Sequence, residues 1–589
     1  MSADPDTPEP DGKDATEAPA PAQSTGRSSI AVGAGILLSR IAGFLREAAL
    51  ARFLGIGFAA DAVRAAMRIP NLLQNLLGEG VLSAAFIPVY SRIVESEDEE
   101  RAGEVAGAIA GILIAVTTAV TAVVVVFARP ITAVMTPGFD GRTFDLTVTL
   151  VRIMTLGLGF LVMSAWCLGI LNSHRRFFLP FVAPVLWNAA QIVVIVFVGL
   201  LGWTDSSIAV ALAWALVVGG LLQLVVQLPA VLRLVPHLRL SLRSKERDVR
   251  DVLRRTGPAL LGRGIVQISA FADVVLASML VTGAVAALGY AQVLYVLPIS
   301  LFAMSVAAAE LPELSRESEA VRQIQLRLVI ALRRIVFYVF FAAVMYVTVG
   351  DLIISVLFEG GEFTHDDTLL VWYILVGYSV AIVASSESRL LQNTLYARND
   401  VVTPAEIAAV RLVVSVGLSI PLMFSLDRLV IVDGHISGWS DLPAFWPLPA
   451  DVRSEAGTVH LGAVGIALAS SFASLVEVAL LRRRCSTELG WNPPIGRSVS
   501  RLVPVALLTG MESVALVIGL EAIPDILSLP FILVAAFVTW IAASHWLGLF
   551  EADEAMIPVR RAVERVREAY RPSSRGSGDQ HDAGGGPSR

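Results

Sequence analysis

The 589-residue sequence has few cysteines, lysines and histidines, and each shortage excludes a class of chemistry. Its two cysteines, Cys167 and Cys485, are far apart and support neither a disulfide framework nor a cysteine-rich metal site. The seven histidines show no metal-ligand spacing. The two lysines, Lys13 and Lys245, lie outside any P-loop pattern, and no nucleophile elbow or H-E-x-x-H motif occurs. We therefore expect a protein that is not an enzyme and that binds no cofactor, metal or nucleic acid.

Charge is the next shortage, because only 16% of the residues are charged, against roughly a quarter in soluble domains. Hydrophobic residues make up 55%, and the mean hydropathy is +0.70. About 20 apolar residues in a helix cross a bilayer core of roughly 30 Å, so we predict an all-α polytopic membrane protein with about fourteen transmembrane segments. The predicted segments are 29–52, 60–94, 105–128, 144–171, 183–202, 206–235, 252–281, 284–312, 326–349, 368–392, 403–424, 458–482, 500–520 and 527–549.

Arginine is distributed unevenly between the predicted loops. Basic residues gather in 174–176, 239–255 and 482–501, which the positive-inside rule assigns to the cytoplasm. The loops between them are poor in basic residues, and the long segment 427–460 contains only Arg428 and Arg453. We therefore expect both termini to be cytoplasmic.

The two ends of the chain differ from its apolar middle. Residues 1–28 are rich in Pro, Ala, Asp and Glu without an apolar stretch, which predicts a disordered cytoplasmic tail rather than a signal peptide. Residues 550–589 begin with a basic amphipathic stretch over 551–570 and end in a Gly/Ser-rich tail that we expect to be disordered. The amphipathic stretch is predicted to lie on the inner leaflet, although a cytosolic helix fits the same pattern.

A short repeat divides the apolar part of the chain. Residues 84–92 and 308–316 share the pattern A-A-x-[IL]-P-x-x-S-R, and each copy closes the second helix of a predicted half. Internal repeats of this kind are typical of transporters. We therefore predict two pseudo-symmetric lobes of about six helices each, residues 29–235 and 252–482, joined by the basic cytoplasmic linker 236–251. The two helices within 500–549 are then an addition.

The first two predicted helices carry charges where lipid disfavours them. An arginine at the bilayer centre costs roughly 2.5–3.5 kcal/mol, so such a residue is expected to face a wet cavity or a partner. Arg40 and Arg46 lie deep in the first helix, and Asp61, Arg64 and Arg68 share one face of the second. Arginine binds phosphate through a planar, permanently charged fork. Arg40 and Arg46 therefore predict a cavity for an anionic substrate, most naturally a phosphate or pyrophosphate.

Two further features lie within predicted helices. Asp273 sits in an apolar run, and it is either a proton or cation site or the structural partner of an arginine such as Arg263. Gly78-Glu79-Gly80 interrupts the segment 60–94, which indicates either a hinge or a packing kink.

A series of short motifs between residues 29 and 550 occurs in the order found in a known family. Those of the charged helices are Ser39-Arg40-Ile41-Ala42-Gly43-Phe44-Leu45-Arg46-Glu47, Asp61-Ala62, Ile69-Pro70-Asn71-Leu72-Leu73, Glu79-Gly80 and Ala85-Phe86-Ile87-Pro88. Later ones include Met135-Thr136-Pro137-Gly138-Phe139, Pro184-Val185-Leu186-Trp187-Asn188, Leu311-Pro312-Glu313-Leu314-Ser315 and Tyr396-Ala397-Arg398-Asn399-Asp400. As a set, these motifs resemble the MurJ/MviN family of lipid II flippases in the MOP exporter superfamily.

The resemblance implies a central cavity between the two lobes and a lipid-tail groove formed by the helices within 500–549. It implies alternating access that moves lipid II, an undecaprenyl-pyrophosphate-linked peptidoglycan precursor, outward across the bacterial cytoplasmic membrane. Membrane lipids and cell-wall synthesis proteins are the further partners it implies. By position, Arg40, Arg46, Asp61 and Glu79 match charged residues of the family.

The sequence departs from the family pattern in the second and eighth helices. Gln74 and Val293 stand where relatives often have arginine, and we take Arg64, Arg68 and Arg263 as substitutes for the missing cavity charge. Asp273 matches a cation-site aspartate of some relatives, but the expected asparagine partner is not evident near Ser419. Two alternatives therefore stay open, a flippase for another polyprenyl-linked glycan of the O-antigen or capsule type and a cell-wall assembly scaffold without transport activity.

Overall fold

The structure is a computed structural model. It describes residues 23–78, 82–83, 85–242, 246–303, 321–398, 400, 402–432, 434–439, 443–453, 459–490 and 495–556. The predicted tails at 1–22 and 557–589 and the second repeat copy at 308–316 lie outside this description. So do Glu79 and the side chain of Arg263.

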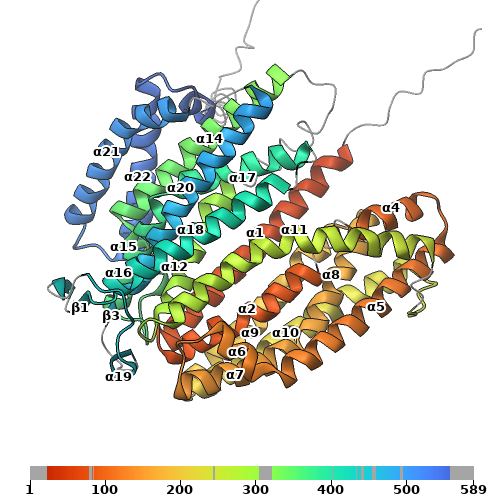
Figure 1. Cartoon of the computed structure of the whole chain (residues 1–589). Helices are drawn as coiled ribbons and strands as arrows, with labels where there is room; N and C mark the ends of the chain where they lie inside the picture. Colours follow the sequence, from red (N-terminus) through yellow and green to blue (C-terminus); the bar gives the residue numbers. More distant parts are fainter. Residues whose placement is uncertain are drawn as a thin grey trace, which may run out of the picture. The chain divides into compact units, whose positions relative to one another are not determined.

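Almost all described elements are helices (Figure 1). Those of the first half are α1 (Gln23–Leu54), α2 (Phe58–Leu77), α4 (Ile87–Glu95), α5 (Glu99–Val126), α6 (Ala128–Met135), α7 (Gly141–Leu156), α8 (Leu158–Ser173), α9 (Phe178–Leu200), α10 (Asp205–Leu234) and α11 (Arg247–Ser278). Those of the second half are α12 (Ala284–Pro298), the π-helical turn η1 (Ile299–Ala303), α14 (Val321–Thr348), α15 (Gly350–Phe358), α16 (His365–Ser379), α17 (Ile382–Ala397), α18 (Val402–Leu426), α19 (Ala450–Arg453), α20 (Gly462–Leu489), α21 (Ile495–Gly519) and α22 (Asp525–Trp546).

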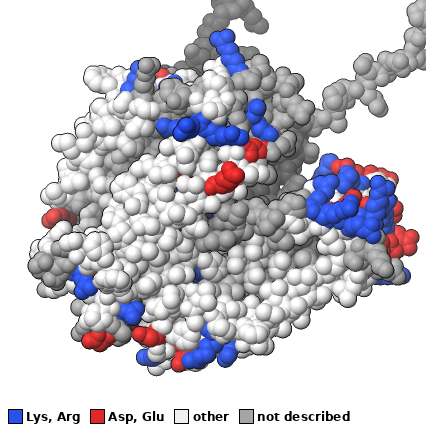
Figure 2. All heavy atoms as spheres, viewed as in Figure 1, with Lys and Arg blue, Asp and Glu red and all other residues white. Residues whose placement is uncertain are grey.

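The prediction of an all-helical multi-span membrane protein is confirmed. Among the described residues, 10 helices are long and apolar enough to cross a membrane, or up to 11 if the bent pair α16 and α17 is one span. This number is below the predicted fourteen, partly because α2 carries Asp61, Arg64 and Arg68 within its 20 residues. On the face shown in Figure 2, the sides of the helices are largely free of charge.

Three predicted boundaries are wrong. The segment 60–94 is not one helix, because α2 ends at Leu77 and α4 begins only at Ile87. The segment 368–392 is divided by a bend of 50° between α16 and α17. Helix α1 begins at Gln23, so the last residues of the predicted disordered tail 1–28 are helical.

The helices form two compact units. Unit 1 comprises 1–49, 66–129 and 148–263, and unit 2 comprises 50–65, 130–147 and 264–589. Residues 50–65 and 130–147 therefore belong to unit 2, although they precede the predicted linker 236–251 in the chain.

The core of unit 1 is built around the first copy of the repeat. Phe86 and Tyr90 are fully buried and stack with ring centroids 5.0 Å apart. Ser91 donates a hydrogen bond of 3.0 Å to Ser173 at the end of α8. Trp166 of α8 donates from its indole nitrogen to the Ala106 carbonyl of α5 at 3.2 Å. This copy of the repeat thus packs α4 against α5 and α8.

Residues 236–242 of the predicted linker 236–251 form a turn followed by an irregular segment that lies along α5, while α11 begins within the linker at Arg247. Gly103, Gly107 and Gly111 of α5 face this segment. A Cβ atom at Gly107 would come within 2.0 Å of the Arg239 carbonyl oxygen. Glycines spaced by four residues share one face of the helix, and they let the two backbones touch.

We expect Gly107→Ala to release the segment 236–242 from α5. In a helix, alanine is more stable than glycine by about 1 kcal/mol. A loss of stability in this variant can therefore come only from the clash with the segment, which we expect to cost about 1–3 kcal/mol. Trypsin should then cleave faster after Arg239. Gly159→Ala on α8 is the matched control, because the nearest neighbour of its Cβ is 3.8 Å away. Unchanged cleavage together with higher thermal stability of Gly107→Ala would contradict this account.

The long loop after α18 contains a three-stranded antiparallel sheet that the all-helical prediction missed. Its strands are β1 (Val430–Val432), β2 (His435–Ser437) and β3 (Val459–His460), in the order β2-β1-β3. The Asp-Gly pair at 433–434 is a strong two-residue hairpin signal, and Gly434 has a φ of 76°. The hairpin could therefore have been predicted from the sequence.

The same loop buries a carboxylate outside the membrane-spanning helices. Burial raises the pKa of Asp427 from 3.8 to about 7, while Arg428, Arg453 and the Val281 amide act to lower this pKa. The folded state therefore binds a proton that the unfolded state releases between about pH 4 and pH 7. The contribution of Asp427 to the free energy of unfolding is therefore largest below about pH 4 and is lost as the pH rises to about 7.

We expect Asp427→Asn to be more stable than the wild type at pH 7 but not at pH 4. The gain should be about 2–3 kcal/mol, less than the full shift implies, because Arg428 and Arg453 lose a neighbouring negative charge. Thermal unfolding of the purified wild type and variant between pH 4 and pH 7 measures this difference in stability. Asp525→Asn, which removes an exposed aspartate, should not change the pH profile. A constant difference between Asp427→Asn and the wild type would contradict the prediction.

The two added helices are present as α21 and α22 and pack beside α14 (Figure 1). Trp540 of α22 is fully buried among Phe337, Phe340 and Phe341 of α14. The helical residues just after α22 are held to α14 as well, since Arg333 pairs with Glu551 and Arg334 with Glu554. The start of the predicted amphipathic stretch is therefore fastened to α14. Its remainder lies outside the described residues.

Candidate functional site

Arg46 is held in place by three side chains of unit 1. Its Nη2 lies 2.5 Å from Glu47 Oε1, and its Nη1 donates to Asn188 Oδ1 at 3.2 Å. The guanidinium carbon is 5.1 Å from the centroid of the Trp187 ring on α9. Asn188 in turn donates to the Pro184 carbonyl at 3.1 Å, which fixes the direction of its amide oxygen. The Pro184–Asn188 motif thus positions an arginine of α1, a role that its sequence alone did not reveal.

The guanidinium of Arg46 keeps donors for an anion. Its side chain is only 13% exposed, and its Nε is buried with no acceptor among the described residues. A guanidinium has five N–H donors, and the contacts to Glu47 and Asn188 account for one at each terminal nitrogen. A phosphate could therefore be bound without breaking these contacts.

Arg40 lies on the same helix but in different surroundings. It is exposed, and a helix rises about 9 Å over the six residues between it and Arg46. Glu47, seven residues after Arg40 and therefore on the same side of α1, is only 4% exposed. Gly35 of α1 explains how α1 and α9 come together, because a Cβ there would lie 3.0 Å from the Phe181 Cβ.

Asp61 lies elsewhere, at the start of α2 in unit 2. It is 1% exposed, and its carboxylate accepts hydrogen bonds from the backbone amides of Gly283 at 2.6 Å and Ala286 at 2.7 Å. These amides are the free donors at the start of α12, where a negative charge is most stabilising. Gly283 has a φ of 100°, so the turn that presents its amide favours glycine. Asp61 is therefore a cap of α12.

The turn between α1 and α2 is fastened by further contacts within unit 2. Tyr290 of α12 donates to the Gly55 carbonyl at 3.2 Å, and Glu362 donates its amide to the Arg52 carbonyl at 2.9 Å. The Arg64 guanidinium lies over the Tyr290 ring at 4.4 Å from its centroid. Arg64 thus makes a cation–π contact with Tyr290, which precedes Gln292 and Val293 on α12.

Asp273 belongs to a separate polar cluster of unit 2. Gln292 donates to Asp273 at 3.4 Å and to the Tyr378 hydroxyl at 3.2 Å. Tyr378 stacks on Tyr295 at 4.8 Å, and Tyr295 donates to Ser385 at 2.7 Å. The cluster joins α11, α12, α16 and α17.

Other intramembrane charges of unit 2 are paired. Arg482 donates to both carboxylate oxygens of Glu387, at 2.6 and 2.5 Å. Glu477 accepts from Arg411 at 3.2 Å and from Gln392 at 2.9 Å. Because both carboxylates are nearly fully buried, each arginine is needed to stabilise its partner.

The predicted site residues therefore fall into groups. Arg40 and Arg46 lie on α1 in unit 1, Asp61 and Arg64 contact α12 in unit 2, and Asp273 lies in the polar cluster. Arg68 is half-buried on α2. Among described residues, no group of three or more His, Cys, Asp or Glu side chains could hold a metal ion.

The fold is that of known multi-span transporters. The lipid II flippase MurJ in an inward closed conformation superposes with a TM-score of 0.69 at 20% identity, over 87% of this chain and 98% of that chain. An inward-facing multidrug resistance MATE family transporter of the MOP superfamily has a TM-score of 0.58 at 18% identity, over 78% and 98%. The chain thus has the all-helical, multi-span membrane fold of these transporters.

Sequence comparison identifies the particular family. The family described as lipid II flippase MurJ matches residues 50–446. A probable lipid II flippase MurJ of Rhizobium tropici is 34% identical over 70% of this chain and 78% of its own length. The lipid II flippase MurJ of Burkholderia cenocepacia is 32% identical over 66% and 76%. The chain belongs to the MurJ lipid II flippase family, and the resemblance seen in its motifs is confirmed.

Proposed function

We propose that this chain moves lipid II from the inner to the outer leaflet by alternating access and that α1 binds its pyrophosphate. The observation that carries the site is Arg46, a largely buried arginine whose Nε has no acceptor among the described residues. Glu47 and Asn188 hold the Arg46 guanidinium but do not occupy all of its N–H donors. A pyrophosphate is the natural anion for such a fork, because it offers several oxygens to planar N–H pairs.

Arg40 extends the proposed site along α1. Its exposure suits a first contact with the substrate, whereas Arg46 suits a tighter, desolvated contact. Arg68 and Arg263 are proposed as further cavity charges, and Glu79 as a further acidic residue of the site. In our proposal these residues replace the charges that relatives carry at the positions of Gln74 and Val293.

Asp61 and Arg64 are proposed to act on the conformational cycle. Both attach the start of α2 to α12, through the cap of Gly283 and Ala286 and the stack on Tyr290. An outward opening that separates α2 from α12 must break these contacts. We infer that they stabilise the state in which the segment 50–65 is packed on unit 2.

The proposed orientation places both termini in the cytoplasm and the chain in the bacterial cytoplasmic membrane. Exposed arginines at the end of α8 and at the end of α20 support it, since they lie in the loops assigned to the inside. Asp273, with Gln292 and Tyr378, is proposed as the proton or cation site. Helices α21 and α22 are proposed to bind the lipid tail, and cell-wall synthesis proteins are proposed as partners.

Complementation of a flippase-depleted bacterium tests the function. Wild-type chain should restore growth and outer-leaflet lipid II, whereas a variant lacking both Arg40 and Arg46 should restore neither. Restored growth without outer-leaflet lipid II would favour a scaffold. If the chain does not move lipid II but rescues a mutant that lacks a capsule-unit flippase, the substrate is another glycan. Rescue by the double variant would contradict the proposed binding chemistry.

A further inference from the structure

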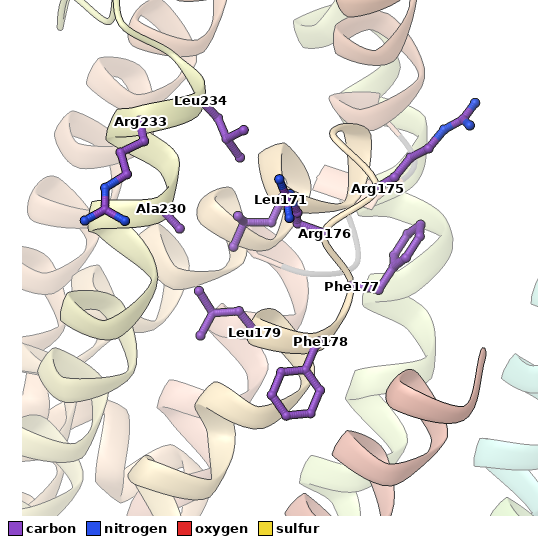
Figure 3. Close-up of a pocket in the computed structure, with 9 residues that line it drawn as sticks. All are labelled: Leu171, Arg175, Arg176, Phe177, Phe178, Leu179, Ala230, Arg233 and Leu234. Carbon is purple, nitrogen blue, oxygen red and sulfur yellow. The ribbon is translucent and has the colours of Figure 1, made fainter. Parts of the chain in front are cut away.

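A second basic site lies at the turn between α8 and α9 in unit 1, apart from the arginines of α1. A pocket of about 510 Å³ opens there between this turn and the end of α10 (Figure 3). It combines cationic and apolar walls. Its lining includes Arg175, Arg176, Arg233, Phe178, Leu179 and Leu234.

Two of the arginines lie in the turn that ends α8. Helix α8 ends with the Arg176 amide donating to the Leu171 carbonyl at 2.8 Å, and Arg175 adopts a φ of 57°. This is the helix end that usually takes glycine at the left-handed position. The chain instead has an arginine there, so the turn carries two consecutive arginines, whose side chains diverge in Figure 3. Arg233, in the last turn of α10, supplies the third cation.

The three guanidinium groups have no acidic partner in the part of the chain that the structure describes. No carboxylate lines the pocket, and no ion pair joins Arg175, Arg176 or Arg233 to another described residue. Elsewhere at this end of unit 1 arginines are paired, as Arg101 is with Asp248 at 2.7 Å. Figure 3 shows Arg175 and Arg233 extending to opposite sides of Arg176. Three cations without acidic partners around the pocket make it electropositive, which favours an anionic ligand.

An apolar surface leads from the pocket along the outside of α10. Leu222, Val226 and Pro229 are exposed and lie on the face of Arg233, at spacings of eleven, seven and four residues from it. Phe178, which is 55% exposed, stands at the start of α9 on the pocket wall. An acyl chain can therefore lie along α10 while a headgroup occupies the pocket.

We propose that this pocket binds the phosphate of an anionic phospholipid of the inner leaflet. The basic loop at 174–176 is one that the charge bias assigns to the cytoplasmic side, where basic pockets between helices bind anionic headgroups. A zwitterionic lipid would bring its own ammonium group toward three arginines and is disfavoured. Asn188, the ligand of Arg46, lies ten residues further along α9, about 15 Å from Phe178, so this lipid is distinct from the transported substrate.

Native mass spectrometry of the purified full chain tests the proposal with phosphatidylglycerol and phosphatidylcholine. The wild type should retain phosphatidylglycerol in preference, and the double variant Arg176→Gln/Arg233→Gln should bind it about tenfold more weakly or less. The matched control Arg250→Gln/Arg254→Gln removes two exposed arginines of α11 and should change binding by less than about twofold. Equal melting temperatures of the three proteins establish that all are folded.

Three results would overturn the proposal. The first is equal retention of phosphatidylglycerol by the double variant and the wild type. The second is equal retention of phosphatidylcholine by the wild type. The third is displacement of phosphatidylglycerol by glycerol phosphate at similar concentration, which would indicate a site for a soluble phosphate. Undiminished lipid II transport by the double variant, with phosphatidylglycerol lost, supports a site separate from the substrate and leaves the proposed function intact.

Discussion

Arg46→Ala is expected to reduce lipid II transport by about 100-fold, the largest effect of any single substitution considered for this chain. The variant loses the charge-assisted hydrogen bonds that the guanidinium would make to pyrophosphate, and no neighbouring cation can replace them in the same place. Arg46→Lys keeps the charge but not the planar fork, so it should retain intermediate activity. The amount of outer-leaflet lipid II in a flippase-depleted strain that carries the wild type, Arg46→Ala or Arg46→Lys measures the transport activity of each.

A structural role of Arg46 must be separated from substrate binding, because Glu47 and Asn188 lose this partner in Arg46→Ala. The double variant Arg46→Ala/Glu47→Gln removes the buried charge as well and should recover much of the thermal stability. Transport should nevertheless stay lost. If the double variant regains transport along with stability, Arg46 serves folding and not the substrate.

Asp61→Ala is expected to lower the free energy of unfolding by about 2–4 kcal/mol. Two buried amides at the start of α12 would lose a charged acceptor, and each such bond is worth about 1.5–3 kcal/mol. Asp61→Asn keeps one carbonyl acceptor and should lose less. Thermal unfolding in detergent gives the comparison, and transport should fall in parallel if the contact of α2 with α12 belongs to the cycle.

The matched control for Asp61→Ala is Asp205→Ala. Asp205 is also an aspartate in the first turn of a helix, but it is exposed, and it should contribute about 0.5 kcal/mol. A similar small loss for Asp61→Ala would show that the buried cap is not needed for stability.

Sequence patterns predicted much of this protein because membrane helices are encoded locally. A bilayer demands a run of apolar residues, and hydropathy within the run is enough to reveal it. The helices α5, α9, α10, α18 and α22 follow their predicted segments closely. The same local logic singled out Arg40 and Arg46, since an arginine in an apolar helix stands out whatever surrounds it.

Hydropathy failed where geometry, and not composition, ended an element. The 50° bend between α16 and α17 interrupts a run that remains apolar. The break after Leu77 instead coincides with Gly78-Glu79-Gly80, where the sequence itself indicated a hinge or kink. The three-stranded sheet after α18 was missed because an all-helical expectation passed over the Asp-Gly signal at 433–434.

By itself, then, the sequence determined the class of protein, the approximate spans and the presence of anomalous charges in α1 and α2. Only the tertiary structure decided what those charges touch. Arg46 meets Asn188, 142 residues away, and Asp61 meets Gly283, 222 residues away. Such contacts depend on how helices pack rather than on any local pattern. For the same reason Asp61, predicted as a cavity residue, lies buried as a cap of α12. Two arginines of a turn and one of α10 line a pocket that no sequence pattern indicated.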